Sequence, residues 1–391
     1  MTPRPLIAPA LAAALALGGC TLFGDDDPEE PTGAAALLAS LNENRRLEDE
    51  LGDIERRIVL DCMEEQGHTL HDPYELQIWD TAEQQSLVER YPFSGFLLDR
   101  EIALEWGFGR WASTDQAMTT GVYQEYMERF WPEFADADAA YAEFNELEPE
   151  ALLDWYIAFM GQDWAVHRTG YEFAVEFLDI EEPQVDPDAN LELTGNPDAS
   201  VAPAPGGCVL EMIETLYDQP RPVPVTGQSD AYVWTWGPEN PEDSADQAAL
   251  LAEYRSAVAE AEDAMVDCLA EDGREGWVFD DTGALPVGRH LSAVYYPEME
   301  WVGVDGEELD APAFPAPPTD VPTDLEGRKA FEVELALAFV DCGETSGYRE
   351  VATAAYDRVQ LDFYTSIETE LFTYQDDLRE ALAQAQDVVG G

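Results

Sequence analysis

A repeated pattern around three of the cysteines is the feature that most constrains the fold of this chain. In each copy an aspartate precedes the cysteine and a glycine follows it five residues later: Asp61–Gly67, Asp267–Gly273 and Asp341–Gly347. Apolar residues recur before each cysteine at alternating spacings of three and four, as on the core-facing side of a helix. The glycine fits the left-handed residue that ends a helix. The pattern therefore predicts helices with an inward thiol near the C-terminus, and Cys208 is expected to point inward from the start of a further helix.

The N-terminus has the organisation of an export signal. Residues 1–19 contain one arginine and then a short alanine and leucine run, which is too short to cross a membrane as a helix. Leu17–Cys20 resembles the lipobox of bacterial lipoproteins, which implies that Cys20 is lipidated and becomes the new N-terminus. An ordinary signal peptide with a chance cysteine, or an uncleaved anchor, is the alternative. Residues 20–33 are acidic and aperiodic, so we expect a disordered tether at the extracytoplasmic face of the cell membrane.

Export also bears on the four other cysteines. Outside the cytoplasm they form two disulfides by default, and three pairings are possible. We predict Cys62–Cys208 and Cys268–Cys342, because the repeat suggests two similar halves and helices that are neighbours in sequence tend to lie side by side. The main alternative is the nested pairing of Cys62 with Cys342 and of Cys208 with Cys268. Loop-closure entropy barely separates the two, since its cost grows only with the logarithm of loop length.

The expected fold is mainly α. Residues 34–391 are predicted to form one helical domain of long antiparallel helices and long proline-rich loops, with minor β structure. Two disulfide-stapled parts, residues 34–217 and 244–391, are expected to compose this domain. Further predictions concern single elements. They are a short helix over 83–90, a strand or helix over 171–177, a half-buried strand with alternating Tyr232, Trp234 and Trp236, a helix capped by Ser244 that ends near Cys268, and one last helix from Tyr348 to the C-terminus.

The order of these motifs resembles a known group of proteins. A helix that ends in Asp61-Cys62-Met63 precedes the aromatic and glycine stretch Trp106–Gly109, and Gly206–Cys208 opens a later helix. This order is similar to that of the uncharacterised, mostly helical lipoproteins of actinobacteria that carry Cys-x-x-x-x-Gly repeats. His68 and Arg274 stand where the resemblance leads us to expect an aromatic residue. The resemblance implies a layout and a membrane anchor, and it implies no catalytic residue.

The chain is strongly acidic, with 83 aspartates and glutamates against 19 lysines and arginines and a formal net charge of −64. Nucleic acids and anionic lipid headgroups would be repelled, so neither is expected as a partner. We interpret the charge as a surface that stays hydrated in high salt or at high pH. Loose cation buffering near the cell envelope is the functional alternative.

The sequence contains none of the common motifs for catalysis or metal binding. Nucleophile-elbow, zinc-protease and phosphate-loop patterns are absent from the sequence, so no cofactor is expected. A zinc site is conceivable at Cys62, His68 and His71, and a calcium loop at Asp186–Glu192, but neither has the usual ligand spacing. We therefore expect no metal.

Two classes of function remain. The preferred hypothesis is a non-enzymatic binding or interaction module, anchored to the membrane by its N-terminal lipid and facing an unidentified envelope partner or ligand. The alternative is an extracellular hydrolase with a carboxylate active site. For the module, the expected contact surface is aromatic: Trp106, Phe108, Trp111, Tyr232, Trp234 and Trp236.

Overall fold

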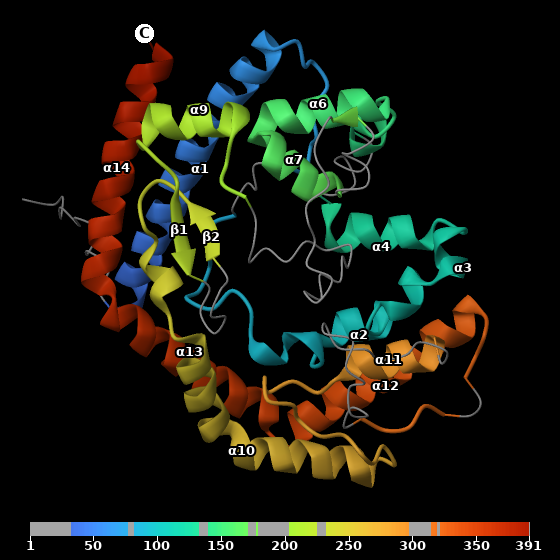
Figure 1. The fold of residues 1–391 in the computed structure, drawn as a ribbon. Coiled ribbons are helices and arrows are strands. Elements are labelled where there is room, and N and C mark those ends of the chain that lie inside the picture. Colours follow the sequence, from blue (N-terminus) through green and yellow to red (C-terminus); the bar gives the residue numbers. More distant parts are fainter. Residues whose placement is uncertain are drawn as a thin grey trace, which may run out of the picture.

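The computed structural model describes residues 33–76, 82–132, 140–170, 177–178, 203–224, 232–296, 314–318 and 321–390. Helices dominate this part of the chain (Figure 1). The long helices are α1 (Ala34–Glu65), α10 (Gln247–Glu271), α12 (Leu325–Thr345), α13 (Tyr348–Ser366) and α14 (Glu368–Gly390). The shorter helices are α2 (Arg100–Trp106), α3 (Asp115–Met118), α4 (Val122–Phe130), α6 (Pro149–Met160), α7 (Gln162–Thr169), α9 (Gly207–Leu216) and α11 (Val287–Tyr295), with 3-10 turns η1 (Pro92–Gly95), η2 (Arg110–Ser113) and η4 (Pro241–Ser244).

A first hydrophobic core lies between α1, α6, α9 and α14, which occupy the upper half of Figure 1. Helix α14 runs beside α1, and α9 crosses both. A buried hydrogen bond of 3.0 Å from the Gln375 amide to the Asn44 side chain joins α14 to α1 inside this packing. The largest buried side chains of the core include Trp155, Phe144, Leu153, Met63 and Ile213.

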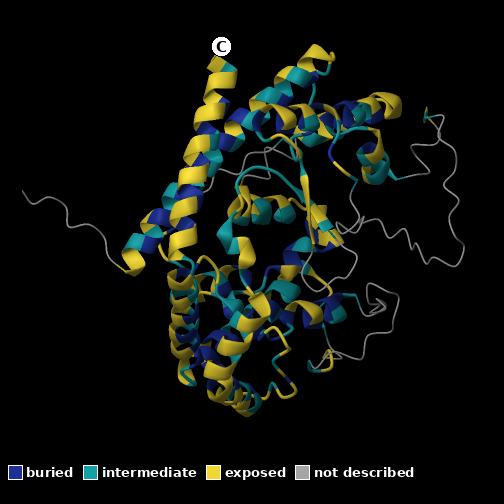
Figure 2. Ribbon diagram, turned by 60° about the vertical axis from the view of Figure 1, so that its left-hand side comes forward, coloured by how far each residue is buried: buried dark blue, intermediate teal, exposed yellow. Residues whose placement is uncertain are grey.

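A second core lies between α10, α11, α12 and α13, in the lower half of Figure 1. Asp246 caps α10 by accepting from the Ala249 N–H at 3.0 Å, and Asp324 caps α12 by accepting from the Gly327 N–H at 2.9 Å. The apolar faces of these helices enclose Tyr254, Trp277, Phe339 and Tyr348, all of which are fully or almost fully buried. Figure 2 shows the corresponding pattern along the helices, with buried residues on inward faces and exposed residues on outward faces.

The backbones of α6 and α9 meet without intervening side chains. Gly207 has a φ of 52°, and a Cβ atom built there would lie 2.2 Å from the carbonyl oxygen of Ala158. The Gly206 N–H donates to the Met160 carbonyl at 2.7 Å. Only glycine permits this approach, which brings the first turn of α9 against the last turn of α6.

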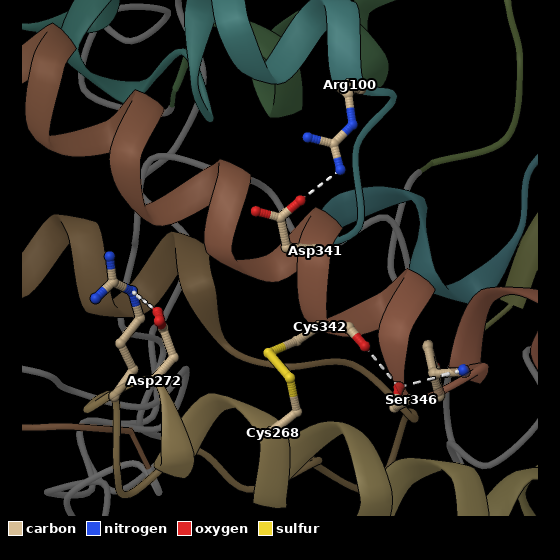
Figure 3. The surroundings of a disulfide bond; sticks show 8 residues. Arg100, Cys268, Asp272, Asp341, Cys342 and Ser346 are labelled. Carbon is tan, nitrogen blue, oxygen red and sulfur yellow. Dashed lines mark hydrogen bonds and ion pairs between the residues drawn. A yellow bond between two sulfur atoms is a disulfide. The ribbon is translucent and has the colours of Figure 1, made fainter.

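Both predicted disulfides are confirmed. Cys62 and Cys208 are bonded with their Cα atoms 5.7 Å apart, and Cys268 and Cys342 with theirs 5.6 Å apart. Figure 3 shows the second bond, which runs between α10 and α12 beside the ion pair of Arg100 and Asp341. The predicted left-handed glycines are confirmed too, because Gly67, Gly273 and Gly347 have φ values of 95°, 81° and 76°.

Three local predictions were wrong. Residues 83–90 form no helix, because the Gln84 backbone instead exchanges two hydrogen bonds with the Asn42 side chain on α1, at 2.8 and 3.0 Å. The cap of α10 is Asp246, whereas Ser244 ends η4 by donating to the Pro241 carbonyl at 2.6 Å. The predicted single C-terminal helix is interrupted at Ile367, where the chain passes from α13 to α14.

Packing crosses the predicted boundary between the two parts, residues 34–217 and 244–391. The C-terminal α14 belongs to the first core, whereas Phe93, Phe96 and Leu97 from the N-terminal part belong to the second. The division of one domain into two disulfide-stapled parts stays a prediction, and residues of both parts contribute to both cores.

The N-terminal predictions lie outside the described residues. This applies to the signal peptide, to Cys20 and to the acidic tether up to residue 32, and also to residues 171–176 of the predicted strand. Among the helices that the structure describes, we find none with the length and apolar character needed to cross a membrane.

Candidate functional site

A cavity of about 490 Å³ opens beside the first core, where α1 faces the contact between α6 and α9. These elements can be followed in the upper half of Figure 1. Acidic and apolar side chains share its wall: Glu48, Asp49, Gly52, Glu55, Arg56, Val59, Glu75, Leu76, Phe159, Met160, Val209, Met212 and Trp236. A concave, partly apolar surface with a few converging polar groups is the usual form of a small-molecule site.

One face of α1 forms the acidic side of the cavity. Glu48, Gly52, Glu55 and Val59 follow one another at spacings of four, three and four residues, so they lie on the same side of the helix. A Cβ atom built at Gly52 would meet no heavy atom within 4 Å. The glycine therefore leaves open space between the two glutamates.

Tyrosine hydroxyls hold both glutamates in place. Tyr217 donates to Glu55 at 2.5 Å, and Tyr374 donates to Glu48 at 2.6 Å. Burial raises the pKa of Glu55, against the lowering effect of hydrogen bonds from Tyr217 and the Trp236 side chain. Burial likewise raises the pKa of Glu48 more than the Tyr374 hydrogen bond lowers it. Both carboxylates are thus short of stabilising positive charge.

A third carboxylate approaches from a separate segment. Glu75 lies 3.0 Å from Nε of Arg168 on α7, and burial still raises its pKa despite this ion pair. Among the described residues of the wall, Arg56 is the only basic one, and its guanidinium lies 3.4 Å from Asp53. The charges of the described lining are therefore four acidic residues against one basic residue.

The opposite wall is apolar. Phe159, Val209 and Met212 are buried side chains of the first core, and Met160 and Trp236 are partly buried against it. The glycine contact between α6 and α9 sets the distance between these residues. The cavity can therefore bury an apolar group while its carboxylates face a positive charge, because a raised carboxylate pKa falls again when a cation binds beside it.

The predicted contact residues Trp106 and Trp111 need correction. Both side chains are only 5% exposed and cannot form a contact surface. They stack with ring centroids 5.7 Å apart, under Nζ of Lys329. Phe108 is half-buried against Phe339, with centroids 5.8 Å apart. Local sequence could not show this, because α12 supplies the cover from more than 200 residues away.

The centre of that aromatic cluster is the fully buried carboxylate of Glu332. It accepts hydrogen bonds from the N–H groups of Arg110 and Trp111, at 2.9 and 2.5 Å, and from the Tyr295 hydroxyl at 2.7 Å. Burial raises the pKa of Glu332 to about 7. Since protein donors surround this carboxylate and solvent does not reach it, we interpret it as an anchor for η2 and not as a site for a substrate.

The other predicted contact residues lie on or next to the β-hairpin. Strand β1 (Arg221–Pro224) pairs antiparallel with β2 (Tyr232–Thr235), which confirms the minor β structure. Tyr232 and Trp234 are partly buried, with ring centroids 5.7 Å apart. Trp236 follows β2 and enters the wall of the cavity, so it is the predicted aromatic residue that the structure places in the candidate site.

A second cavity of about 730 Å³ lies beside α12, with Arg274, Trp277, His290 and Glu334 in its wall. Its polar groups already pair with protein groups. Nδ1 of His290 lies 3.0 Å from the Pro315 carbonyl, and Arg274 binds Glu334 at 3.0 Å. The first cavity is the stronger candidate because burial raises the pKa of three carboxylates in its wall.

Among the described residues, no group of three His, Cys, Asp or Glu side chains is placed to hold a metal ion. Cys62, one residue of the zinc site considered from the sequence, is bonded to Cys208. Burial lowers the pKa of the other two residues, His68 and His71. The conceived calcium loop, residues 186–192, lies outside the described residues.

Sequence reasoning missed Glu48, Glu55 and Glu75, because acidic residues are so numerous that no pair stands out. The spacing of Glu48, Gly52 and Glu55 along a predicted helix was a usable signal.

Comparison with known proteins adds no function: no family model, curated protein or solved structure matches this chain.

Proposed function

We propose that this protein is an exported, membrane-anchored binding protein whose cavity on α1 takes a small organic cation with an apolar part. The observation that carries the proposal is the pairing of Glu48 and Glu55, both with raised pKa, with the apolar wall of Phe159 and Met212. An ammonium group gains charge-assisted hydrogen bonds there, and its alkyl part leaves water. Trp236 hydrogen-bonds Glu55 and adds apolar surface to the wall.

The proposal is tested with hexylamine and isothermal titration calorimetry on the full chain in detergent. Binding of the ammonium ion requires ionised carboxylates, so the affinity should rise with pH above the ordinary glutamate range and protons should be released on binding. Glu55→Gln should weaken binding about tenfold or more, because it removes one charged partner. Glu260→Gln, the same change at an exposed position on α10, is the matched control. Equal binding of neutral hexanol would contradict a cation site.

The membrane anchor is part of the proposal and has its own test. Leu17–Cys20 and the short apolar run before it support lipidation of Cys20. Cys20→Ser should release the protein from membranes or leave the precursor unprocessed, because a lipoprotein relies on more than one acyl chain for firm attachment. A membrane-bound variant with the normal mature mass would overturn the assignment.

A hydrolase is the second candidate, and the raised pKa of Glu55 and Glu48 favours it, since a general acid needs such a shift. Turnover of chromogenic aryl glycosides or esters that is lost in Glu55→Gln and kept in Glu260→Gln would support this candidate. Binding without turnover supports the binding protein.

A further inference from the structure

The acidic groups of the cavity are spread along its wall and do not meet at one point. Glu48 and Glu55 are seven residues apart on α1, which is about 10.5 Å along the helix axis. Glu75 comes from a different segment and pairs with Arg168 of α7. A compact cation can neutralise only one of these positions at a time.

The space between the acidic groups is apolar or empty. Gly52 lies between Glu48 and Glu55 on the helix face and leaves open space, and Val59 continues the same face. Met160 and Met212 line the cavity from α6 and α9. Methionine side chains adapt their shape to flexible chains. The cavity therefore alternates positions for positive charge with positions for methylene groups.

We propose that the occupant is a linear aliphatic amine with two or more ammonium groups separated by methylene chains. This inference rests on the proposed function and adds the class of ligand to it. One ammonium group lies at Glu55, another lies at Glu48, and a third group of a longer amine reaches Glu75, which also pairs with Arg168. Each further ammonium group that finds a carboxylate should tighten binding about tenfold.

A bare metal ion fits this arrangement poorly. Glu48, Glu55 and Glu75 already accept hydrogen bonds or ion pairs from Tyr374, Tyr217 and Arg168, which point each carboxylate in its own direction. A divalent ion such as Mg²⁺ requires several oxygen ligands at close distances around one point. The separated carboxylates suit separated charges instead.

The test compares hexylamine, 1,6-diaminohexane and spermidine by calorimetry on the full chain in detergent, with Mg²⁺ as a competitor. Kd is expected to fall about tenfold at each step of the series, and submillimolar Mg²⁺ should displace none of the three. Equal affinity for all three amines would overturn the inference and leave the proposed function in place. Displacement by Mg²⁺ would show that the cavity binds cations without selectivity for amines. This result would also overturn the inference. Failure of every amine to bind would overturn both.

A steric variant tests the location without changing a charge. Gly52→Leu puts a side chain into the open space between Glu48 and Glu55 and should abolish the preference for spermidine. Gly288→Leu in α11 is the matched control, because a Cβ atom there also meets no heavy atom within 4 Å and the residue is exposed away from the cavity. Spermidine binding that survives in Gly52→Leu, with melting temperatures of the two variants alike, would overturn the assignment to this cavity.

Discussion

The Tyr217 hydroxyl lies 2.5 Å from Oε1 of Glu55, so the residue that follows α9 donates a hydrogen bond to the C-terminal half of α1. The contact opposes the effect of burial on the pKa of Glu55 and also joins the two helices that carry the Cys62–Cys208 disulfide. A covalent bond and a hydrogen bond thus fix the same helix pair at two points.

The first prediction concerns this hydrogen bond. Tyr217→Phe removes a donor to a carboxylate, so the pKa of Glu55 should rise further and the pH at which amine binding sets in should move upward. The free energy of unfolding at pH 7 should fall by roughly 1.5–3 kcal/mol. Calorimetry of hexylamine binding between pH 5 and 8 and chemical denaturation measure the two effects. Tyr123→Phe on α4 is the control, and an unchanged pH profile in Tyr217→Phe would contradict the predicted link.

The second prediction concerns the disulfides. Peptide mapping of the unreduced protein should find the linked pairs Cys62–Cys208 and Cys268–Cys342, which span 146 and 74 residues. Replacement of either pair by serine should lower the free energy of unfolding by about 4 to 5 kcal/mol, because each bond restricts the unfolded chain. The longer loop should cost only about 0.6 kcal/mol more. A peptide that links Cys62 to Cys268 or to Cys342 would contradict the pairing.

The third prediction uses the buried carboxyl of Glu332. Its pKa is raised to about 7, so the folded protein binds this proton more tightly than the unfolded chain does. Its contribution to stability is therefore complete below the ordinary glutamate pKa and is lost as the pH rises through about 7. Lys329, Arg328 and Arg110 are the nearby positive groups. Between pH 4.5 and 8 the wild type should lose roughly 3 kcal/mol relative to Glu332→Gln.

Denaturation curves of the two proteins at matched pH values measure this difference. Glu334→Gln, whose side chain is 78% exposed on the same helix, should follow the wild type. A constant difference between the wild type and Glu332→Gln across the range would show that burial does not perturb this carboxyl.

The fourth prediction concerns salt. The net charge of −64 should destabilise the folded chain through self-repulsion, and added ions should screen it. The melting temperature should rise from dilute buffer to molar NaCl. Most ion pairs of the described residues involve well-exposed side chains and contribute little, so their loss in salt should not offset the gain. Sucrose at the same osmolality is the control for general exclusion effects, and a flat salt profile would remove the environmental interpretation.

Features that depend on residues close together in the sequence were predicted. Features that depend on contacts between residues far apart in the sequence were not. The apolar spacing before Cys268 and the glycine after it are local, and they predicted a helix, its inward face and its end. The cavity depends on contacts between Glu55 and Tyr217 and between Glu48 and Tyr374, which are 162 and 326 residues apart. No local pattern reports such contacts.

The same limit explains the correction at Trp106 and Trp111. A run of aromatic residues has the same local pattern whether it faces solvent or a second helix. Burial of these rings is decided by Glu332 on α12, which binds the N–H of Trp111 from 221 residues away. The prediction that these rings form a contact surface was wrong, because α12 covers them.

The position of α14 against α1 governs the order in which the chain can fold. Leu378 and Leu382 of α14 share one hydrophobic core with Leu47 and Leu51 of α1, and they are synthesised long after α1. The second core, built from α10 to α13, can close before them. The first core cannot close before them, because α1, its first helix in the chain, packs against α14, its last. A chain cut before Glu368 would therefore leave the apolar side of α1 without the cover that α14 provides.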